Sequence, residues 1–153
     1  MRSILFASSL LCLIMACGAA GPGDAVTGFF DALQAGDGEK AAGYLSQQAI
    51  DEMGSLRDYM MGDEAQIAEM AAEFGVSAEE LSNADDRQFV AIVLSSDMMA
   101  GEAEGLVVTV GEVAIEGDRA TVQVTYTMDG DSDTDELELV KEDGGWKLTE
   151  LNM

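Results

Sequence analysis

The sequence predicts an α+β fold in which N-terminal helices pack on an antiparallel sheet of about four strands. In the first two-thirds of the chain, apolar residues recur at helical spacing, and glycines and capping residues separate the runs. From residue 106 onward, apolar and polar residues alternate as in half-buried strands, with Gly-Asp or Asp-Gly pairs between the runs. Helices followed by strands is the order typical of the α+β class.

Composition limits the possible functions of this single domain. The 153 residues are 48% hydrophobic, and 7 Lys and Arg against 30 Asp and Glu give a formal net charge of −23. This negative charge repels phosphate backbones, so we expect no nucleic-acid partner. Cations and basic proteins are the partners that the charge allows. The alternative is that the charge simply keeps a secreted domain soluble. The chain has no histidine, and both cysteines fall within the first 17 residues. We therefore expect no metal, no cofactor and no disulfide framework.

The start of the chain predicts export and lipidation. Residues 1–16 begin with Met-Arg and continue as an apolar run too short for a comfortable membrane span, so they are predicted as a signal peptide. Residues 13–18, LIMACG, resemble a bacterial lipobox, although Met15 departs from the usual small residue at its position. The resemblance implies cleavage after Ala16 and acylation of Cys17, for example with palmitate. The alternative is an ordinary signal peptide with Cys17 as a free thiol.

Lipidation would determine where this acidic protein is located in the cell. Residues 17–23 are then the lipidated cysteine and a short tether, and residues 24–153 are the single α+β domain. The acyl chain on Cys17 would make the lipid bilayer a partner. We expect a membrane anchor in the bacterial cell envelope, facing the periplasm or the exterior, and in the outer membrane if two membranes are present.

The helices are predicted from stripes and caps. Asp24 is expected to cap a first helix that ends at Gly36. Asp37 is expected to cap a second helix, and Ser46 a short piece that stops at Gly54. The apolar stripe of the first helix is Val26, Phe29, Phe30 and Leu33.

The next stretch predicts three more helical pieces after an uncertain short helix over 55–62. A stripe over 67–74 ends at Gly75, and Ser77 with Glu80 matches a capping box. The last helix is predicted to open at Ser82 or Asn83 and to run through the apolar residues up to 94.

The strands are predicted over 106–115, 119–128, 136–141 and 146–151. Gly111 is expected to form a bulge, and 119–128 should be the central strand because turn pairs flank it on both sides. Residues 129–136 carry carboxylates at alternate positions but fail the EF-hand pattern, because Thr134 replaces the glycine at the sixth position. We interpret them as a solvated hairpin loop, with weak calcium binding as the alternative.

Four segments together resemble a known family. They are FFDAL at 29–33, GDGEKAAGYL at 36–45, IEGDRATV at 115–122 and LVKEDGGWKL at 139–148. In this order they are similar to small bacterial lipoproteins of unknown function in the nuclear transport factor 2-like superfamily. The resemblance covers 24–48 and 106–151, and it implies a curved, cone-like sheet wrapped around a long helix. Relatives use the apolar cavity of the cone for ligands, catalysis or dimerisation, and residues 49–105 would add helix over its mouth.

The cone-like fold that the resemblance implies suggests which residues could line a pocket. Phe30, Tyr44, Val124 and Tyr126 are the candidate pocket residues. The one catalytic arrangement that we can propose is Asp31 with Tyr44 or Tyr126 as a hydrogen-bond donor. Asp31 lies off the apolar stripe of its helix and is expected to be exposed, so we predict no catalytic residue. The paired methionines at 60–61 and 98–99 are interpreted as core filler, because adjacent helical residues point about 100° apart and form no single ligand face. Trp146 is interpreted as a core anchor.

These observations predict an uncharacterised envelope lipoprotein, not an enzyme, that binds an apolar small molecule or a protein partner. The first alternative is a structural or interaction module whose core is filled. The second is a hydrolase or isomerase that uses Asp31.

Overall fold

The computed structural model describes residues 20–150, which form seven helices and one four-stranded antiparallel sheet. The predicted α+β class and the order of helices before strands are therefore confirmed. The predicted signal peptide and Cys17 lie outside the described residues. The elements are α1 (Pro22–Gln34), α2 (Gly38–Ala42), α3 (Gln47–Met60), α4 (Glu64–Phe74), α5 (Ala78–Asn83), α6 (Asp86–Leu94), α7 (Asp97–Ala103), β1 (Val107–Glu116), β2 (Arg119–Met128), β3 (Asp131–Glu142) and β4 (Gly145–Leu148).

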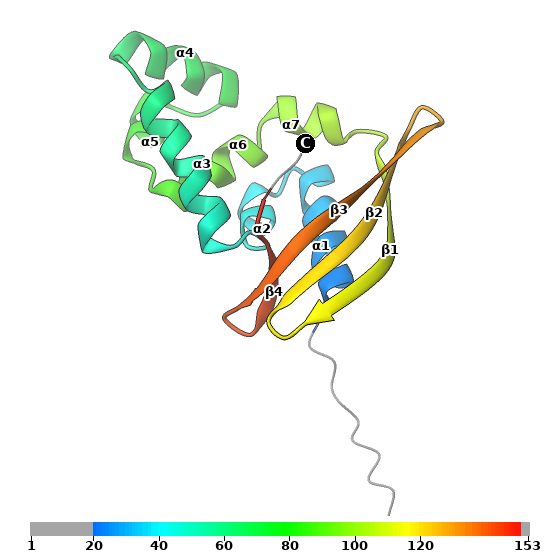
Figure 1. Ribbon diagram of the computed structural model, residues 1–153. Helices are drawn as coiled ribbons and strands as arrows, with labels where there is room; N and C mark the ends of the chain where they lie inside the picture. The colour runs from blue at the N-terminus through cyan, green and yellow to red at the C-terminus, as the bar shows by residue number, and fades with distance from the viewer. Residues whose placement is uncertain (1–19, 151–153) are drawn as a thin grey trace, which may run out of the picture.

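The sheet curls around α1, as Figure 1 shows. Its strand order is β1-β2-β3-β4, so β2 is paired on both sides as predicted. Val122, Val124 and Leu137 are buried on one face of the sheet, because apolar residues alternate with polar ones along β2 and β3. The bulge expected at Gly111 is confirmed by a register shift between Val110 and Val113.

Helix α1 begins earlier than the sequence predicts. Its N-cap is Gly21 and Pro22 occupies the first helical position, where a fixed φ and a missing N–H cost nothing. The carboxylate of Asp24 accepts a hydrogen bond from the Gly21 N–H at 2.8 Å, so Asp24 closes the first turn from inside the helix. Pro22 and Gly23 therefore belong to α1, so the prediction that they are part of the tether is wrong.

Two other helix boundaries differ from the prediction. Helix α3 continues through Gly54. A glycine inside a helix is only about 1 kcal/mol less favourable than alanine, and the missing side chain at Gly54 lets Asp86 of α6 pack closely against α3. A Cβ atom at Gly54 would lie under 3.0 Å from side-chain carbons of Asp86. Helix α5 ends at Asn83, and α6 is capped by Asp85, which exchanges hydrogen bonds of 2.8 and 3.0 Å with Gln88. The expected start at Ser82 or Asn83 is wrong because this second capping box is the stronger start signal.

The acidic segment after β2 is a strand beyond its first two residues. Asp129 and Gly130 have φ of 53° and 93° and form the turn, and β3 begins at Asp131. Hydroxyl pairs tie β3 to β2: Thr134 lies 3.0 Å from the Thr125 hydroxyl, and residues 127 and 132 form a similar pair. The interpretation of 129–136 as a solvated loop is therefore wrong for 131–136, because cross-strand pairing outweighs the low strand propensity of Asp and Ser.

The helices after α2 lie mostly beside the cone. Figure 1 shows α4 and α5 away from the sheet, whereas α3 touches it at its first residue, because the Gln47 N–H donates a hydrogen bond of 3.0 Å to the Glu142 carboxylate on β3. Helix α7 lies beside α1 near the end of the sheet where β1 begins. No local sequence pattern predicts α7, which is capped by Ser96. The prediction that residues 49–105 add helix over the mouth of the cone therefore fits α7 better than it fits α3, α4 or α5.

Basic side chains link the layers through backbone carbonyls. Arg87 donates a hydrogen bond of 3.0 Å to the carbonyl oxygen of Ala42, and Lys147 on β4 donates to that of Gly43. Arg57 lies 3.1 Å from the carboxylate of Asp86. Within residues 20–150, no helix is both long and apolar enough to cross a bilayer.

Candidate functional site

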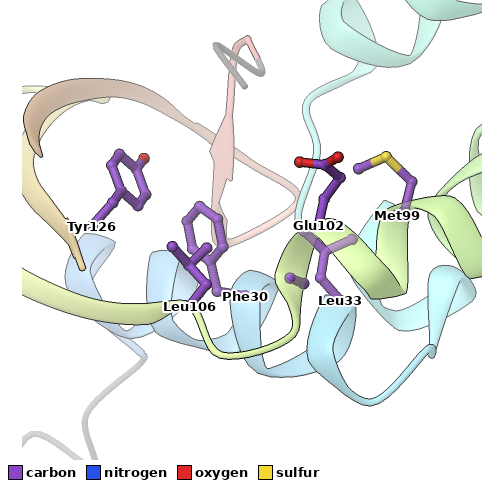
Figure 2. Close-up of a pocket in the computed structure, with 7 residues that line it drawn as sticks. Phe30, Leu33, Met99, Glu102, Leu106 and Tyr126 are labelled. Atoms are coloured by element: carbon purple, nitrogen blue, oxygen red, sulfur yellow. The ribbon is translucent and has the colours of Figure 1, made fainter. Parts of the chain in front are cut away.

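An apolar cavity of about 180 Å³ lies where α1, α7 and β2 meet. Figure 2 shows Tyr126 on one side of it, Met99 and Glu102 on the other, and Phe30 and Leu106 between them. Its lining residues are Phe30 and Leu33 from α1, Met99, Glu102 and Ala103 from α7, Leu106 from the link to β1, and Tyr126 from β2.

Two aromatic rings form the fixed part of the wall. Phe30 is 4% exposed, and its ring packs edge to face on that of Tyr126 with 5.6 Å between centroids. Phe29, which is fully buried, holds Phe30 from the other side in a second edge-to-face contact at 5.2 Å. Such pairs add about 0.5–1.5 kcal/mol beyond the burial of their area, so this side of the cavity is preorganised.

The link between α7 and β1 forms the opposite part of the wall. Gly105 has a φ of 79°, a conformation that lets the chain turn sharply from α7 into β1. The side-chain amide of Gln34 on α1 then donates a hydrogen bond of 2.6 Å to the carbonyl oxygen of Leu106. This contact fastens the link to α1 and holds the Leu106 side chain at the cavity.

The electrostatics of the cavity are negative. Glu102 is exposed and is the charged member of the lining, which contains no basic residue. Burial raises the pKa of Tyr126 above its ordinary value of 10.0, and the charge of Asp135 on β3 raises that pKa further. In the β2–β3 register Asp133 stands opposite Tyr126, and Asp135 stands opposite Val124. The neighbouring carboxylates of β3 therefore share the sheet face on which Tyr126 lies.

Two of the four predicted pocket residues line this cavity, namely Phe30 and Tyr126. Val124 does not, because it is fully buried between the sheet and α1, which fills that part of the cone. Tyr44 also lies elsewhere: its hydroxyl and ring pack over Gly28 on α1. Sequence reasoning missed the remaining lining residues: Leu33, Met99, Glu102, Ala103 and Leu106.

The other candidate residues stand apart from the cavity. Asp31 is exposed and does not line it, as expected from its place off the helix stripe. Met99 lines the cavity, whereas Met98 is 53% exposed and is no core filler. Trp146 is partly buried against the core. In the described part of the chain, His, Cys, Asp and Glu form no group of three or more that could hold a metal ion.

A curved antiparallel sheet around one helix, with an apolar cavity at one end, defines a small α+β pocket protein. The chain belongs to the family described as a domain of unknown function, DUF4878, whose sequence model matches residues 15–149. Among solved structures, it is similar to a Campylobacter jejuni protein described as a candidate NTF2-like transpeptidase, with 14% identity, a TM-score of 0.45, and coverage of 84% of this chain and 96% of that one. No curated protein matches the chain significantly.

Proposed function

We propose that this protein is a bacterial envelope lipoprotein whose domain binds a small apolar ligand and catalyses no reaction. The cavity carries the proposal, because six of its seven lining residues are apolar or aromatic. Its volume of about 180 Å³ is small for a typical ligand site but exceeds the ~150 Å³ of an engineered cavity that accepts benzene. A ligand whose apolar part is about one ring in size would fit.

The non-catalytic part of the proposal rests on the chemistry of the lining. Ser, Thr and Cys, the usual nucleophiles of acyl transfer, are absent from the seven lining residues. Of the two reactive groups in the lining, the Glu102 carboxylate is exposed to water, and the raised pKa of Tyr126 keeps its phenol protonated. Asp31, the sole catalytic candidate suggested by the sequence, is exposed and outside the cavity. Binding is therefore the simpler use of this lining.

The envelope location is proposed from the lipobox-like residues 13–18. The test is the membrane fraction of bacteria that express the full chain and are fed an alkyne analogue of palmitate. Cys17→Ser should lose the label and leave the membrane fraction. Cys12→Ser is the matched control, because it changes a cysteine within the segment expected to be removed, and it should behave like the original chain. A Cys17→Ser protein that keeps its label and its location would refute lipidation.

Ligand binding is tested by native mass spectrometry of the exported Cys17→Ser chain. A bound molecule should appear as an added mass that leaves on denaturation. Adding Leu106→Trp should fill the cavity and remove that mass. Val107→Trp is the control, because the neighbouring side chain is 59% exposed and lies outside the lining. No added mass in any of the three proteins would count against a retained ligand and favour the second candidate function.

The second candidate function is a protein-interaction module. One face of α3 exposes three large apolar side chains at helical spacing: Leu56 is 58% exposed, Tyr59 88% and Met60 45%. A photo-crosslinking residue at position 59 should capture one envelope protein if this face binds a partner. The same residue at Asp51, which is exposed on α3 but points about 130° away from these three side chains, should not capture it.

A further inference from the structure

We propose that the ligand of this cavity carries a basic group, such as an ammonium, next to its apolar part, and that Glu102 recognises this group. The inference rests on the proposed function, since it specifies the ligand class of the same cavity. Three features of the structure carry it: the carboxylate in the lining, the acidic face of β3, and the positions of the basic residues.

The lining offers one charged group, and it is negative. Glu102 lies on α7 across the cavity from Tyr126, as Figure 2 shows, and its exposed side chain places the carboxylate where the cavity meets solvent. A ligand held by Phe30 and Leu33 would therefore have its outer end near this carboxylate. An ammonium there gains a charge-assisted hydrogen bond, whereas a carboxylate or phosphate would meet a like charge.

The strand beside the cavity strengthens this preference. Asp133 and Asp135 are on the same sheet face as Tyr126, and the charge of Asp135 is felt at the Tyr126 phenol, whose pKa it raises. The same negative potential favours a cation near the ring. The ring of Phe30, which lies between Tyr126 and Glu102 in Figure 2, can add a cation–π attraction for an ammonium within about 6 Å of its centre, worth roughly a further factor of two to five in affinity.

Four of the six basic residues in residues 20–150 make contacts elsewhere or lie far from the cavity. Arg87 and Lys147 donate to backbone carbonyls of residues 42 and 43. Lys141 lies 6.0 Å from the centre of the Trp146 ring on the β3–β4 hairpin. Arg119 is at the opposite end of β2 from Tyr126, about 23 Å away along the strand at ~3.3 Å per residue. These four residues therefore do not neutralise the negative charge at the cavity, which can attract a cationic ligand.

The experiment uses three probes that share one apolar part: 3-phenylpropylamine, 3-phenylpropanol and 3-phenylpropionate. They are cationic, neutral and anionic at pH 7. Each is titrated into the exported Cys17→Ser chain, and the methyl signal of Met99, which lines the cavity, is followed by NMR. The amine should bind roughly three- to tenfold more tightly than the alcohol, and the propionate more weakly than either.

Two matched variants separate recognition by Glu102 from the general field of a chain with a formal charge of −23. Glu102→Gln should lower the ratio of amine affinity to alcohol affinity by roughly two- to fivefold. Glu104→Gln removes the same unit of charge from an exposed residue at the end of α7 that does not line the cavity, and it should leave this ratio unchanged.

The outcomes distinguish the two proposals. If none of the three probes moves the Met99 signal, the cavity does not bind ligands of this size, and the proposed function fails together with this inference. If the alcohol or the propionate binds as tightly as the amine, the cavity binds apolar ligands but the inferred basic group is wrong. Equal effects of Glu102→Gln and Glu104→Gln would also overturn the inference, because they would assign the preference to net charge.

Discussion

The close packing of α2 on α6 makes Gly38→Ala an informative substitution. Gly38 is buried at the start of α2, next to the buried Ala41 and Ala42. A Cβ atom at position 38 would lie well under 3.0 Å from the carbonyl oxygen of Ala91 and from the hydroxyl of Ser95. That carbonyl already accepts hydrogen bonds from the Ser95 N–H at 3.0 Å and from its hydroxyl at 2.7 Å. The end of α6 therefore cannot yield without losing these bonds.

The expected cost follows from these contacts. Inserting a methyl group into a closely packed contact costs about 1–3 kcal/mol, and one weakened hydrogen bond adds about 1 kcal/mol. Replacing glycine restricts the unfolded chain and returns about 0.4–1 kcal/mol, since the backbone at Gly38 is not left-handed and alanine can adopt it. We expect Gly38→Ala to lower the free energy of unfolding by about 1–3.5 kcal/mol in urea titrations followed by circular dichroism.

The matched control is the same substitution at Gly101. This glycine lies inside α7, and a Cβ atom there would have no neighbour within 4 Å. Gly101→Ala should therefore raise the free energy of unfolding by about 0.5–1 kcal/mol. Opposite signs for one chemical change would isolate the contact between α2 and α6. A Gly38→Ala protein within about 0.5 kcal/mol of the original would refute the close packing, since no clash would then be present.

Three further predictions concern the cavity and the acidic strand. Because the folded-state pKa of Tyr126 is raised, its contribution to stability is complete below about pH 10 and is lost as the pH rises through the folded pKa. Asp135→Asn should lower that pKa in a tyrosinate absorbance titration corrected with Tyr126→Phe; an unchanged titration would contradict the effect of Asp135. Gln34→Glu removes the amide group that donates to the Leu106 carbonyl, so it should lower the free energy of unfolding by about 1 kcal/mol and speed hydrogen exchange at residues 104–108. Unchanged exchange there would show that this hydrogen bond does not hold the link between α7 and β1. Calcium at about 1 mM should leave the melting temperature unchanged, since His, Cys, Asp and Glu of the described residues form no group of three or more that could hold one ion; a rise of several degrees would reinstate a site.

Local patterns predict much of this fold because they report local physics. Alternation over 119–128 predicts β2 to the residue, since one face of that strand packs on α1. Side chains of Asp37 and Ser46 cap helices as predicted, accepting hydrogen bonds from backbone N–H groups three residues on. Gly54 misleads because its role is close packing with another helix, which no local pattern reports. The start of β3 is missed for the same reason, as its pairing with β2 is a tertiary contact.

The cavity was predictable only in part. Phe30 belongs to the apolar stripe of α1, and Tyr126 belongs to the alternating apolar residues of β2. Both residues can therefore be predicted from the spacing of apolar residues. Met99 and Glu102 come from α7, a helix of seven residues whose sequence has no apolar stripe. Its place beside α1 depends on the chain path through α6 and on the bond between Gln34 and Leu106, neither of which can be read from spacing.

The bulge in β1 has a consequence for how the molecule behaves among copies of itself. β1 is an edge strand of ten residues, and at its bulge Gly111 and Glu112 stand opposite the single residue Gln123. Two edge strands can pair only if their backbone hydrogen-bonding groups stay in register along both strands. The extra residue of the bulge shifts this register in the middle of β1. Glu112 and Glu116 would also bring like charges together if two copies of β1 paired. The open side of the sheet is thereby protected against growth into a continuous sheet with a neighbour, so the chain can be crowded without aggregating along this edge.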